Sequence, residues 1–333
     1  MKEKPLIIAN PNSENLTTQE ISIVEDILGV KVNVTGSFGD LERVLIDHKD
    51  APAVGIMGGD GTVMRTRTFV EDIWSERPAY IFFPNGTMNN VQGALGLKRS
   101  TRTTIKLAGY AAAELKKSNP RYASLASIAV NEFKGFNTGV GIPPKLLWMD
   151  YGHSAIDFLN KQASLRRTEK VGLENIGKLD DKSTFRAIWK IYTGLDDSRS
   201  DEYELFSQPI YGDIILDGQS WDENKRRPLG IYMASYEEVN FGFPFWNPKP
   251  SPGARAVESK LEVVAPYGYP EDIKGQLFRV ARGKRMADTL YQHVTKVEVP
   301  DQRIAQVCGE IITAYGFTME YDGKVKVLTP FSN

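Results

Sequence analysis

A glycine-rich segment near residue 60 has the residue types and spacing of a phosphate loop. Gly58-Gly59-Asp60-Gly61-Thr62 follows a short apolar run and precedes a segment with helical spacing. Glycines let the backbone approach a ligand without Cβ clashes, and a helix N-terminus attracts phosphate through its unpaired N–H groups. Asp60 would repel bare phosphate, so it suits a place beside Mg²⁺ or as an acceptor from an attacking hydroxyl. A plain glycine-rich turn with an aspartate N-cap is the alternative.

Three more polar, turn-forming loops follow predicted strands in the same part of the chain. They are Asn10-Pro11-Asn12-Ser13, Thr35-Gly36-Ser37-Phe38-Gly39-Asp40 and Pro84-Asn85-Gly86-Thr87-Met88-Asn89-Asn90. Ligands of open α/β sheets bind at the C-terminal edge of the parallel strands, where such loops lie. Together the four loops predict a nucleotide-binding site.

Strand-like and helix-like segments alternate over the first 125 residues and must position these loops. The predicted strands are Leu6–Ala9, Val30–Thr35, Ala53–Met57 and Tyr80–Phe83. The predicted helices are Thr18–Leu28, with Thr17 or Thr18 as N-cap and Gly29 as stop, Asp40–His48 and Val63–Trp74. This alternation predicts an α/β domain, residues 1–125, with a parallel sheet and helices on both faces.

Residues 126–333 have a different pattern, typical of an antiparallel β-sandwich domain. The segments that read as strands, the first of which starts just before this part, are Tyr122–Val130, Phe133–Thr138, Leu205–Leu216, Leu229–Ser235, Val257–Val264, Val294–Val299 and Val325–Leu328. Between about residues 143 and 192 the apolar spacing is closer to helical, which predicts a helical insertion.

The composition excludes several classes of protein. The 333 residues include 41 Lys plus Arg and 42 Asp plus Glu, for a formal net charge of −1, which gives no electrostatic footprint for nucleic acid. One cysteine and three histidines argue against a disulfide framework or a Cys/His zinc site. The N-terminal apolar run is too short for a signal peptide, and no run suits a membrane-spanning helix, so the expected location is the cytoplasm.

These motifs resemble the diacylglycerol kinase catalytic family, which includes bacterial lipid kinases and, more distantly, sphingosine and ceramide kinases. The similarity lies mainly in Gly58 to Thr62 and in Pro84-x-Gly86-Thr87-x-Asn89. Weaker similarities are Asn10-Pro11-x-Ser13, Thr35 to Asp40, Phe136-Asn137-x-Gly139-x-Gly141 and Gln306-Val307-Cys308-Gly309-Glu310. The resemblance implies that an α/β nucleotide domain and a β-sandwich use ATP and Mg²⁺ to phosphorylate a lipid hydroxyl.

The resemblance also implies roles for individual residues. Glu310 would accept the proton of the lipid hydroxyl, with Asp60 as the other candidate, and a carboxylate is suited to that task. Metal ligands would be Asp60 and Glu258. The implied nucleotide-binding residues are Asn10, Thr35, Gly58, Gly59, Asp60, Gly61, Thr62, Arg65, Gly86, Thr87 and Asn89.

The chain departs from the family pattern at several of these positions. Cys308 stands where the family has an aspartate, and Lys260 falls in the stretch that matches a structural metal turn. Asn90 replaces another family aspartate, and Arg65 follows the phosphate loop where the family has an Asn-Glu pair. These changes leave two alternatives to a lipid kinase: an NAD kinase-like enzyme, and a nucleotide- or lipid-binding protein with degraded catalysis.

Two further stretches predict transient contact with a membrane surface. The aromatic segment Phe241 to Trp246 suits an acyl chain or the membrane interface, with a loop packed on its own domain as the alternative. The basic stretch from Lys161 to Lys170 suits anionic headgroups, with a solvated helix face as the alternative. The expected partners are therefore a lipid substrate and a membrane surface contacted peripherally; a homodimer is compatible with the sequence, and nucleic acid is not expected.

Overall fold

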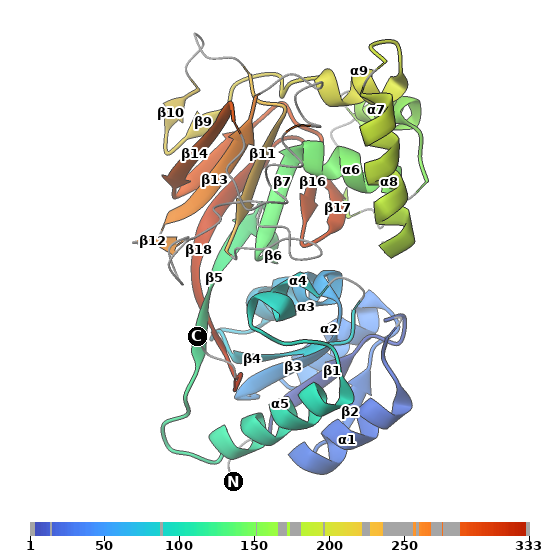
Figure 1. The fold of residues 1–333 in the computed structure, drawn as a ribbon. Helices are drawn as coiled ribbons and strands as arrows, with labels where there is room; N and C mark the ends of the chain where they lie inside the picture. The colour runs from blue at the N-terminus through green and yellow to red at the C-terminus, as the bar shows by residue number, and fades with distance from the viewer. Residues whose placement is uncertain are drawn as a thin grey trace. The chain divides into compact units, whose positions relative to one another are not determined.

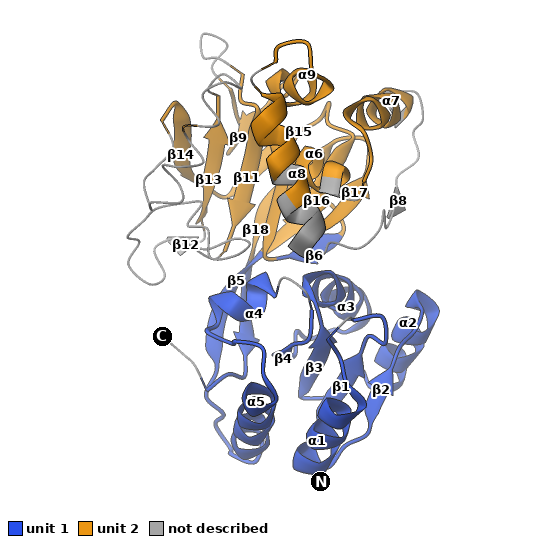
Figure 2. Cartoon of the chain, turned by 45° about the vertical axis from the view of Figure 1, so that its right-hand side comes forward, with its two compact units in different colours: residues 1–127, 133–135, 323–333 blue, residues 128–132, 136–322 orange. Residues whose placement is uncertain are grey.

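The chain folds into two compact units (Figure 2). Unit 1 comprises residues 1–127, 133–135 and 323–333, and unit 2 comprises residues 128–132 and 136–322. The computed structural model describes residues 4–13, 15–86, 89–150, 152–165, 172–173, 181–195, 197–221, 227–235, 256–257, 260–267, 275 and 287–330.

Unit 1 is built on a parallel sheet with the strand order β2-β1-β3-β4-β18 (Figure 1). Its strands are β1 (Leu6–Ala9), β2 (Val32–Val34), β3 (Ala53–Gly58), β4 (Ala79–Pro84) and the final part of β18 (Phe317–Val327). Every residue of β1, β3 and β4 is buried, as expected for a parallel sheet covered on both faces. The chain adds β2 on one side of β1 and then β3 and β4 on the other side, so the strand order reverses and a topological switch point lies between β1 and β3.

The helices that the structure describes in unit 1 are α1 (Thr18–Leu28), α2 (Phe38–Asp47), α3 (Asp60–Ile73), α4 (Asn90–Ala94) and α5 (Thr101–Glu114). The helices α1 and α5 pack together on one face of the sheet, and α2 and α3 pack together on the other. Thr17 caps α1 through a capping box with Glu20, and Gly29 ends the helix with φ 63°. The predicted cap and stop of this helix are confirmed.

Unit 2 contains a separate antiparallel sheet with the order β12-β13-β11-β7-β16-β17-β8, to which β14 adds beside β13. Its strands are β7 (Asn137–Gly141), β8 (Gly172–Leu173), β11 (Gly230–Ala234), β12 (Ala256–Val257), β13 (Lys260–Pro266), β14 (Thr289–Val294), β16 (Ile304–Val307) and β17 (Glu310–Thr313). A second antiparallel set joins β10 (Gln219–Ser220), β9 (Ile215–Leu216), β15 (Lys296–Val299) and the first part of β18.

Helices of unit 2 pack against one part of this sheet. They are α6 (Ile142–Asp150), α7 (Ala155–Leu165), α8 (Asp181–Gly194) and α9 (Asp201–Ser207). Their buried side chains form one apolar cluster with Ile304 and Ile311 of the β16–β17 hairpin. Within it the rings of Trp148 and Phe158 meet edge to face. None of the described helices has the length and apolar character needed to cross a bilayer.

The predicted fold class, a parallel α/β part followed by an antiparallel part with helices inserted, is confirmed. Five local predictions are wrong. Leu205 lies on helix α9, because Ser200 caps a first turn rich in acidic residues, and a strand appears only at Ile215. Three predicted strands, 133–138, 257–264 and 294–299, each include residues of two strands: β6 (Phe133–Gly135) and β7, β12 and β13, and β14 and β15. Helix α3 begins at Asp60, three residues before the predicted start.

Candidate functional site

The loop between β3 and α3 joins a buried strand directly to a helix N-terminus. Gly59 is the N-cap of α3 and has no side chain to satisfy the first N–H groups of the helix. Gly58 is equally constrained, because a Cβ there would lie 2.7 Å from the Cβ and Oγ1 of Thr62. The first turn of this 14-residue helix therefore offers backbone N–H groups and the positive end of its dipole to an anion.

Asn10 connects this loop to the end of β1, across the switch point of the sheet. Its backbone N–H donates to the carbonyl of Met57 at 3.1 Å, and its side-chain Nδ2 donates to Oγ1 of Thr62 at 2.9 Å. The carboxyl ends of β1 and β3 are thus held together by one residue, at the position where doubly wound sheets bind ligands.

Gly86, in the loop after β4, lies directly against Gly59. A Cβ built on Gly86 would come within 2.2 Å of the Cα of Gly59, so only glycine fits without moving the backbone. Asn89 holds the Gly86 loop in shape: it has left-handed backbone angles, φ 49° and ψ 43°, and its Oδ1 accepts from the N–H of Gly86 at 2.8 Å. Asn15 adds a hydrogen bond of 3.1 Å to the carbonyl of Gly86.

Asp60 ties the same two loops together through its carboxylate. The side chain is 7% exposed, and its two oxygens accept from the backbone N–H groups of Asn90, at 2.8 Å, and Val91, at 3.1 Å. It therefore satisfies the first turn of α4, not of its own helix. Burial raises the pKa of Asp60 to about 6, against the lowering effect of these hydrogen bonds.

The other candidates in unit 1 lie beside the same strand ends. Thr35 is buried and donates its backbone N–H to the carbonyl of Ala9 at 2.9 Å, so it follows β2 next to the end of β1. Arg65 is half-buried on α3, with its guanidinium carbon 4.7 Å from the centre of the Phe38 ring. The structure thus brings together the unit 1 candidates that it describes: Asn10, Thr35, Gly58, Gly59, Asp60, Gly61, Thr62, Arg65, Gly86 and Asn89.

Several predicted residues lie outside the described part of the chain. Among them are Thr87, Glu258, the aromatic segment Phe241 to Trp246 and the second half of the basic stretch, residues 166–170. Within the described ranges, no group of three or more His, Cys, Asp or Glu side chains is placed to hold a metal ion. A magnesium ion bound here would therefore need further ligands beside a single carboxylate, such as the phosphates of a nucleotide.

The family-like residues of unit 2 form one hydrogen-bonded network around the β16–β17 hairpin. Asn137 is buried, and its Oδ1 accepts from the N–H of Cys308 at 3.0 Å and from Nε2 of Gln306 at 3.3 Å. Gln306 in turn accepts from the N–H of Gly309 at 2.9 Å. This network fixes the turn, and Glu310 follows it as the half-buried first residue of β17, opposite Val307.

Cys308 occupies a turn position that is unfavourable for its residue type. It has φ 49° and Gly309 has φ 80°, the signs of a two-residue type I′ hairpin turn, for which Asn, Asp and Gly are preferred. The thiol is 1% exposed, and Sγ accepts from the N–H of Phe136 at 3.2 Å. The position where the family has an aspartate is therefore filled by a buried thiol.

Buried polar residues around the loops were not predicted. Gln92 donates from Nε2 to the carbonyl of Gly58 at 3.2 Å, and Asn85 donates from Nδ2 to Oε2 of Glu20 at 3.1 Å. Both amides are almost fully buried. Asn85 lies in the predicted loop 84–90 and Gln92 follows that loop by two residues on α4, so closeness in sequence to the loop is the available indication.

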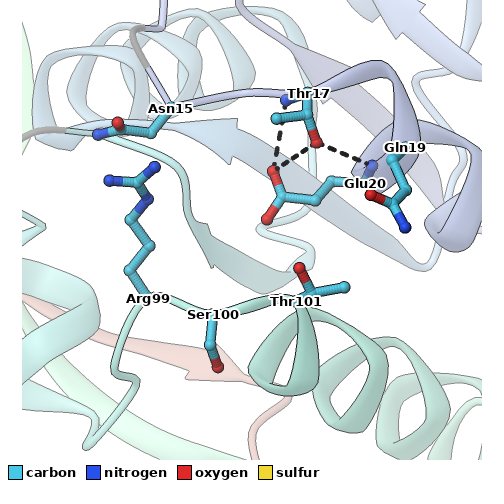
Figure 3. Close-up of a pocket in the computed structure, with 7 residues that line it drawn as sticks. All are labelled: Asn15, Thr17, Gln19, Glu20, Arg99, Ser100 and Thr101. Carbon is cyan, nitrogen blue, oxygen red and sulfur yellow. Dashed lines mark hydrogen bonds between the residues drawn. The ribbon is translucent and has the colours of Figure 1, made fainter.

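A cavity of about 330 Å³ opens beside these loops within unit 1 (Figure 3). It lies between the N-termini of α1 and α5, and Arg99 extends along it toward Asn15. Oε2 of Glu20 accepts from both the N–H and the hydroxyl of Thr17, at 3.3 and 3.2 Å. The residues that line it are Asn15, Thr17, Gln19, Glu20, Arg99, Ser100 and Thr101. Its polar lining suits a hydrophilic molecule.

Comparison with known proteins agrees with this geometry. Residues 4–125 match the family model of the diacylglycerol kinase catalytic domain. A crystal structure described as a "putative diacylglycerol kinase" from Bacillus anthracis str. Sterne is similar over 98% of both chains, with 15% identity and a TM-score of 0.67. A diacylglycerol kinase from the same organism has 14% identity and a TM-score of 0.60, over 98% of this chain and 97% of that one.

Because the sequence identities are low, these structural similarities show a shared fold and nothing further. The comparison with curated proteins gave no match. The family match covers the four loops at the sheet edge, so the segment of residues 4–125 is similar to the diacylglycerol kinase catalytic domain.

Proposed function

We propose that the protein is an ATP-dependent kinase that transfers the γ-phosphoryl group to the hydroxyl of a lipid such as diacylglycerol. The observation that carries the proposal is the joined pair of loops, in which Gly59 and Gly86 meet at a distance that no side chain allows. The Asp60 carboxylate also links these two loops through the backbone N–H groups of Asn90 and Val91. The pair of loops, which we call the phosphate cradle, is therefore preorganised before a ligand binds. The family match of residues 4–125 supports a kinase.

In this proposal the phosphates lie at the first turn of α3. Its N–H groups and the hydroxyl of Thr62 donate to phosphate oxygens, and Asn10 orients that hydroxyl. Arg65, on the same helix, reaches phosphate after leaving the Phe38 ring. Bound Mg²⁺ would offset phosphate charge, with Asp60 as its nearest protein candidate through the lone pairs that Asn90 and Val91 leave unused.

Glu310 is the proposed proton acceptor. The lipid oxygen forms a bond to the γ-phosphorus as the bond to the β–γ bridging oxygen breaks, the hydroxyl proton passes to the Glu310 carboxylate, and ADP leaves. What supports this role is the hydrogen-bonded turn of the β16–β17 hairpin, held by Asn137 of β7 and by the bond of Gln306 to Gly309, which orients the first residue of β17. Such positioning is the main requirement of phosphoryl transfer.

A lipid substrate requires contact with a lipid surface, and α8 offers a suitable face. Trp189 is 57% exposed and its ring stacks on Tyr192 at 6.0 Å. Arg186 and Lys190 are exposed on the same helix, whereas Ile191 is buried in the core. An exposed indole between two cations favours the interface of an anionic bilayer. Trp189→Ala is expected to weaken sedimentation with phosphatidylglycerol vesicles, and Ile105→Ala, at an exposed position of unit 1, serves as the control.

The proposed reaction is tested by following ADP release from Mg·ATP with diacylglycerol, monoacylglycerol, a sphingoid base and NAD as separate acceptors. Turnover with a lipid that falls at least 100-fold in both Asp60→Asn and Glu310→Gln is the expected result. Turnover with NAD alone would instead identify an NAD kinase-like enzyme. Rates equal to those of Asp60→Asn on every acceptor would refute both kinase activities.

A second candidate is a nucleotide- or lipid-binding protein without turnover, and Cys308 favours it. Its thiol is buried and engaged by Phe136, so the turn before Glu310 lacks the carboxylate of the family. Binding of Mg·ATP, measured by calorimetry, without turnover on any acceptor would support this candidate. Cys308→Asp provides the direct comparison, because the type I′ turn accepts aspartate.

A further inference from the structure

The backbone connects the two units at four points. They lie between Ser127 and Ile128, Glu132 and Phe133, Gly135 and Phe136, and Asp322 and Gly323. Any rotation of one unit against the other must use backbone torsions near these points, because no other covalent connection exists. The residues that fix their unit 1 ends therefore determine where a hinge begins.

Arg67 of α3 binds two of these ends at once. Its side chain is fully buried, with Nη2 donating to Oγ of Ser127 at 2.7 Å and Nη1 donating to the carbonyl of Gly135 at 3.1 Å. Nη2 also pairs with Oε1 of Glu71 at 2.7 Å. Only the planar guanidinium fork has donors in two directions at this separation, so lysine does not replace it.

Neighbours of Arg67 bind next to a third end and lie close to the fourth. Oγ1 of Thr68 accepts from the backbone N–H of Lys134 at 2.9 Å, next to the crossing before Phe133. Oε2 of Glu71 pairs with Nη2 of Arg77 at 2.6 Å, and the other Nη of Arg77 lies 3.5 Å from where a Cβ on Gly323 would stand. We call Arg67, Thr68, Glu71 and Arg77 the α3 clamp.

We infer that the α3 clamp is a positioning device, with Arg67 at its centre, that ties the hinge of the two units to the helix that binds phosphate. The inference rests on the proposed function. Arg67 is seven residues after Asp60, about 10 Å along the axis of one continuous helix. A displacement of the first turn of α3 would therefore be transmitted to the crossings that Arg67 and Thr68 bind, at Ser127, Phe133 and Gly135. The clamp acts through the backbone it holds, and it does not contact substrate.

The test uses two variants of graded severity and one control. Arg67→Lys retains the charge but loses the fork, and Ser127→Ala removes one buried hydroxyl, so at least this variant is expected to fold. Thr104→Ala, which removes a hydroxyl 1% exposed on α5, is the matched control. Spin labels are placed on cysteines introduced for Arg43, 72% exposed in unit 1, and exposed Asn160 in unit 2. The native Cys308 is buried and remains unlabelled.

Pulsed dipolar spectroscopy of the whole chain measures the width of the distance distribution between the labels. We expect both clamp variants to broaden it, with kcat about 10-fold lower and KM for ATP within twofold of the unsubstituted chain. Thr104→Ala should change neither. An unchanged width in the folded clamp variants would overturn the inference. Failure of the proposed function is distinguishable, because it appears as absent turnover in the unsubstituted chain and leaves the distance measurement valid.

Discussion

Gly86→Ala is the sharpest test of the loop pair, because the structure fixes the size of the perturbation. The added Cβ would lie 2.2 Å from the Cα of Gly59, 2.9 Å from its N and 3.1 Å from Oδ1 of Asn89. Ordinary contacts of a Cβ begin near 3.4 Å. Because the Cα of Gly59 is backbone and cannot rotate away, the loops after β3 and β4 must separate by about 1.2 Å, the difference between those distances.

A separation of this size should affect ligand binding more than folding. Overpacking costs about 1–3 kcal/mol, whereas a domain is stable by about 5–15 kcal/mol, so the variant remains folded. A displacement of about 1 Å in a positioned site costs on the order of 100-fold. We therefore expect Gly86→Ala to lower Mg·ATP affinity by about two orders of magnitude, with a melting temperature only a few degrees lower.

Isothermal calorimetry with Mg·ATP measures the affinity, and differential scanning calorimetry measures the melting temperature. Gly93→Ala and Gly109→Ala are matched controls, because an added Cβ has nothing within 4 Å at either helical position. Gly59→Ala, whose Cβ would meet the Cα of Gly86 at 3.1 Å, should give an intermediate loss. If folded Gly86→Ala binds Mg·ATP within threefold of the unsubstituted chain, the loop pair is not the phosphate cradle.

Three further predictions follow from buried ionisable groups and from the hairpin turn. Because the pKa of Asp60 is near 6, kcat/KM for ATP should fall below pH 6 as the carboxylate is protonated. A profile that is flat from about pH 5 to 8 would contradict a role of the ionised Asp60 carboxylate in the reaction. Burial lowers the pKa of Lys145 to about 7, from 10.5, so the unfolded chain binds more protons between these values and the free energy of unfolding rises with pH across that window. The full rise is roughly 5 kcal/mol, and chemical denaturation should show it shrink in Lys145→Met. Cys308→Asn should relieve about 1 kcal/mol of strain from the left-handed backbone conformation, but it also removes the buried thiol. We therefore expect the unfolding free energy of the variant to lie within about 1 kcal/mol of that of the unsubstituted chain. A loss above about 3 kcal/mol would show that the packing of Sγ dominates.

The periodic elements of unit 1 could be predicted from sequence because local signals and burial agree there. Helix α1 has an apolar face, a capping box at Thr17 and a left-handed glycine at its end, and each feature is visible within a few residues. The segment after Leu205 shows the opposite case. Its apolar residues are compatible with a strand. The Ser200 cap that begins the helix precedes the apolar run, so the spacing of the apolar residues alone does not reveal it.

The candidate site could be predicted as a set of loops but not as a set of contacts. Parallel topology brings the loops after β1, β3 and β4 to one edge, so Asn10, Gly58 and Gly86 were expected near one another. The contact of Gly59 with Gly86 joins residues 27 positions apart, and no local pattern reports such an approach. The α3 clamp is similarly invisible in sequence, because Arg67 reads as one more charged residue on a helix.

Asp60 shows how a correct motif can suggest an incomplete role. From sequence alone, its carboxylate is expected beside a metal or a hydroxyl, because phosphate would repel it. In the structure two backbone N–H groups of α4 already offset its charge, which explains how an acidic residue is accommodated at a phosphate loop. These donors belong to the backbone, so the replacement of an expected aspartate by Asn90 leaves the bond in place. The substitution at Cys308, in contrast, alters the turn that precedes Glu310. We therefore expect nucleotide binding to be the more robust property of the chain and phosphoryl transfer the more sensitive one, so that Cys308→Asp should change turnover while leaving Mg·ATP affinity within twofold.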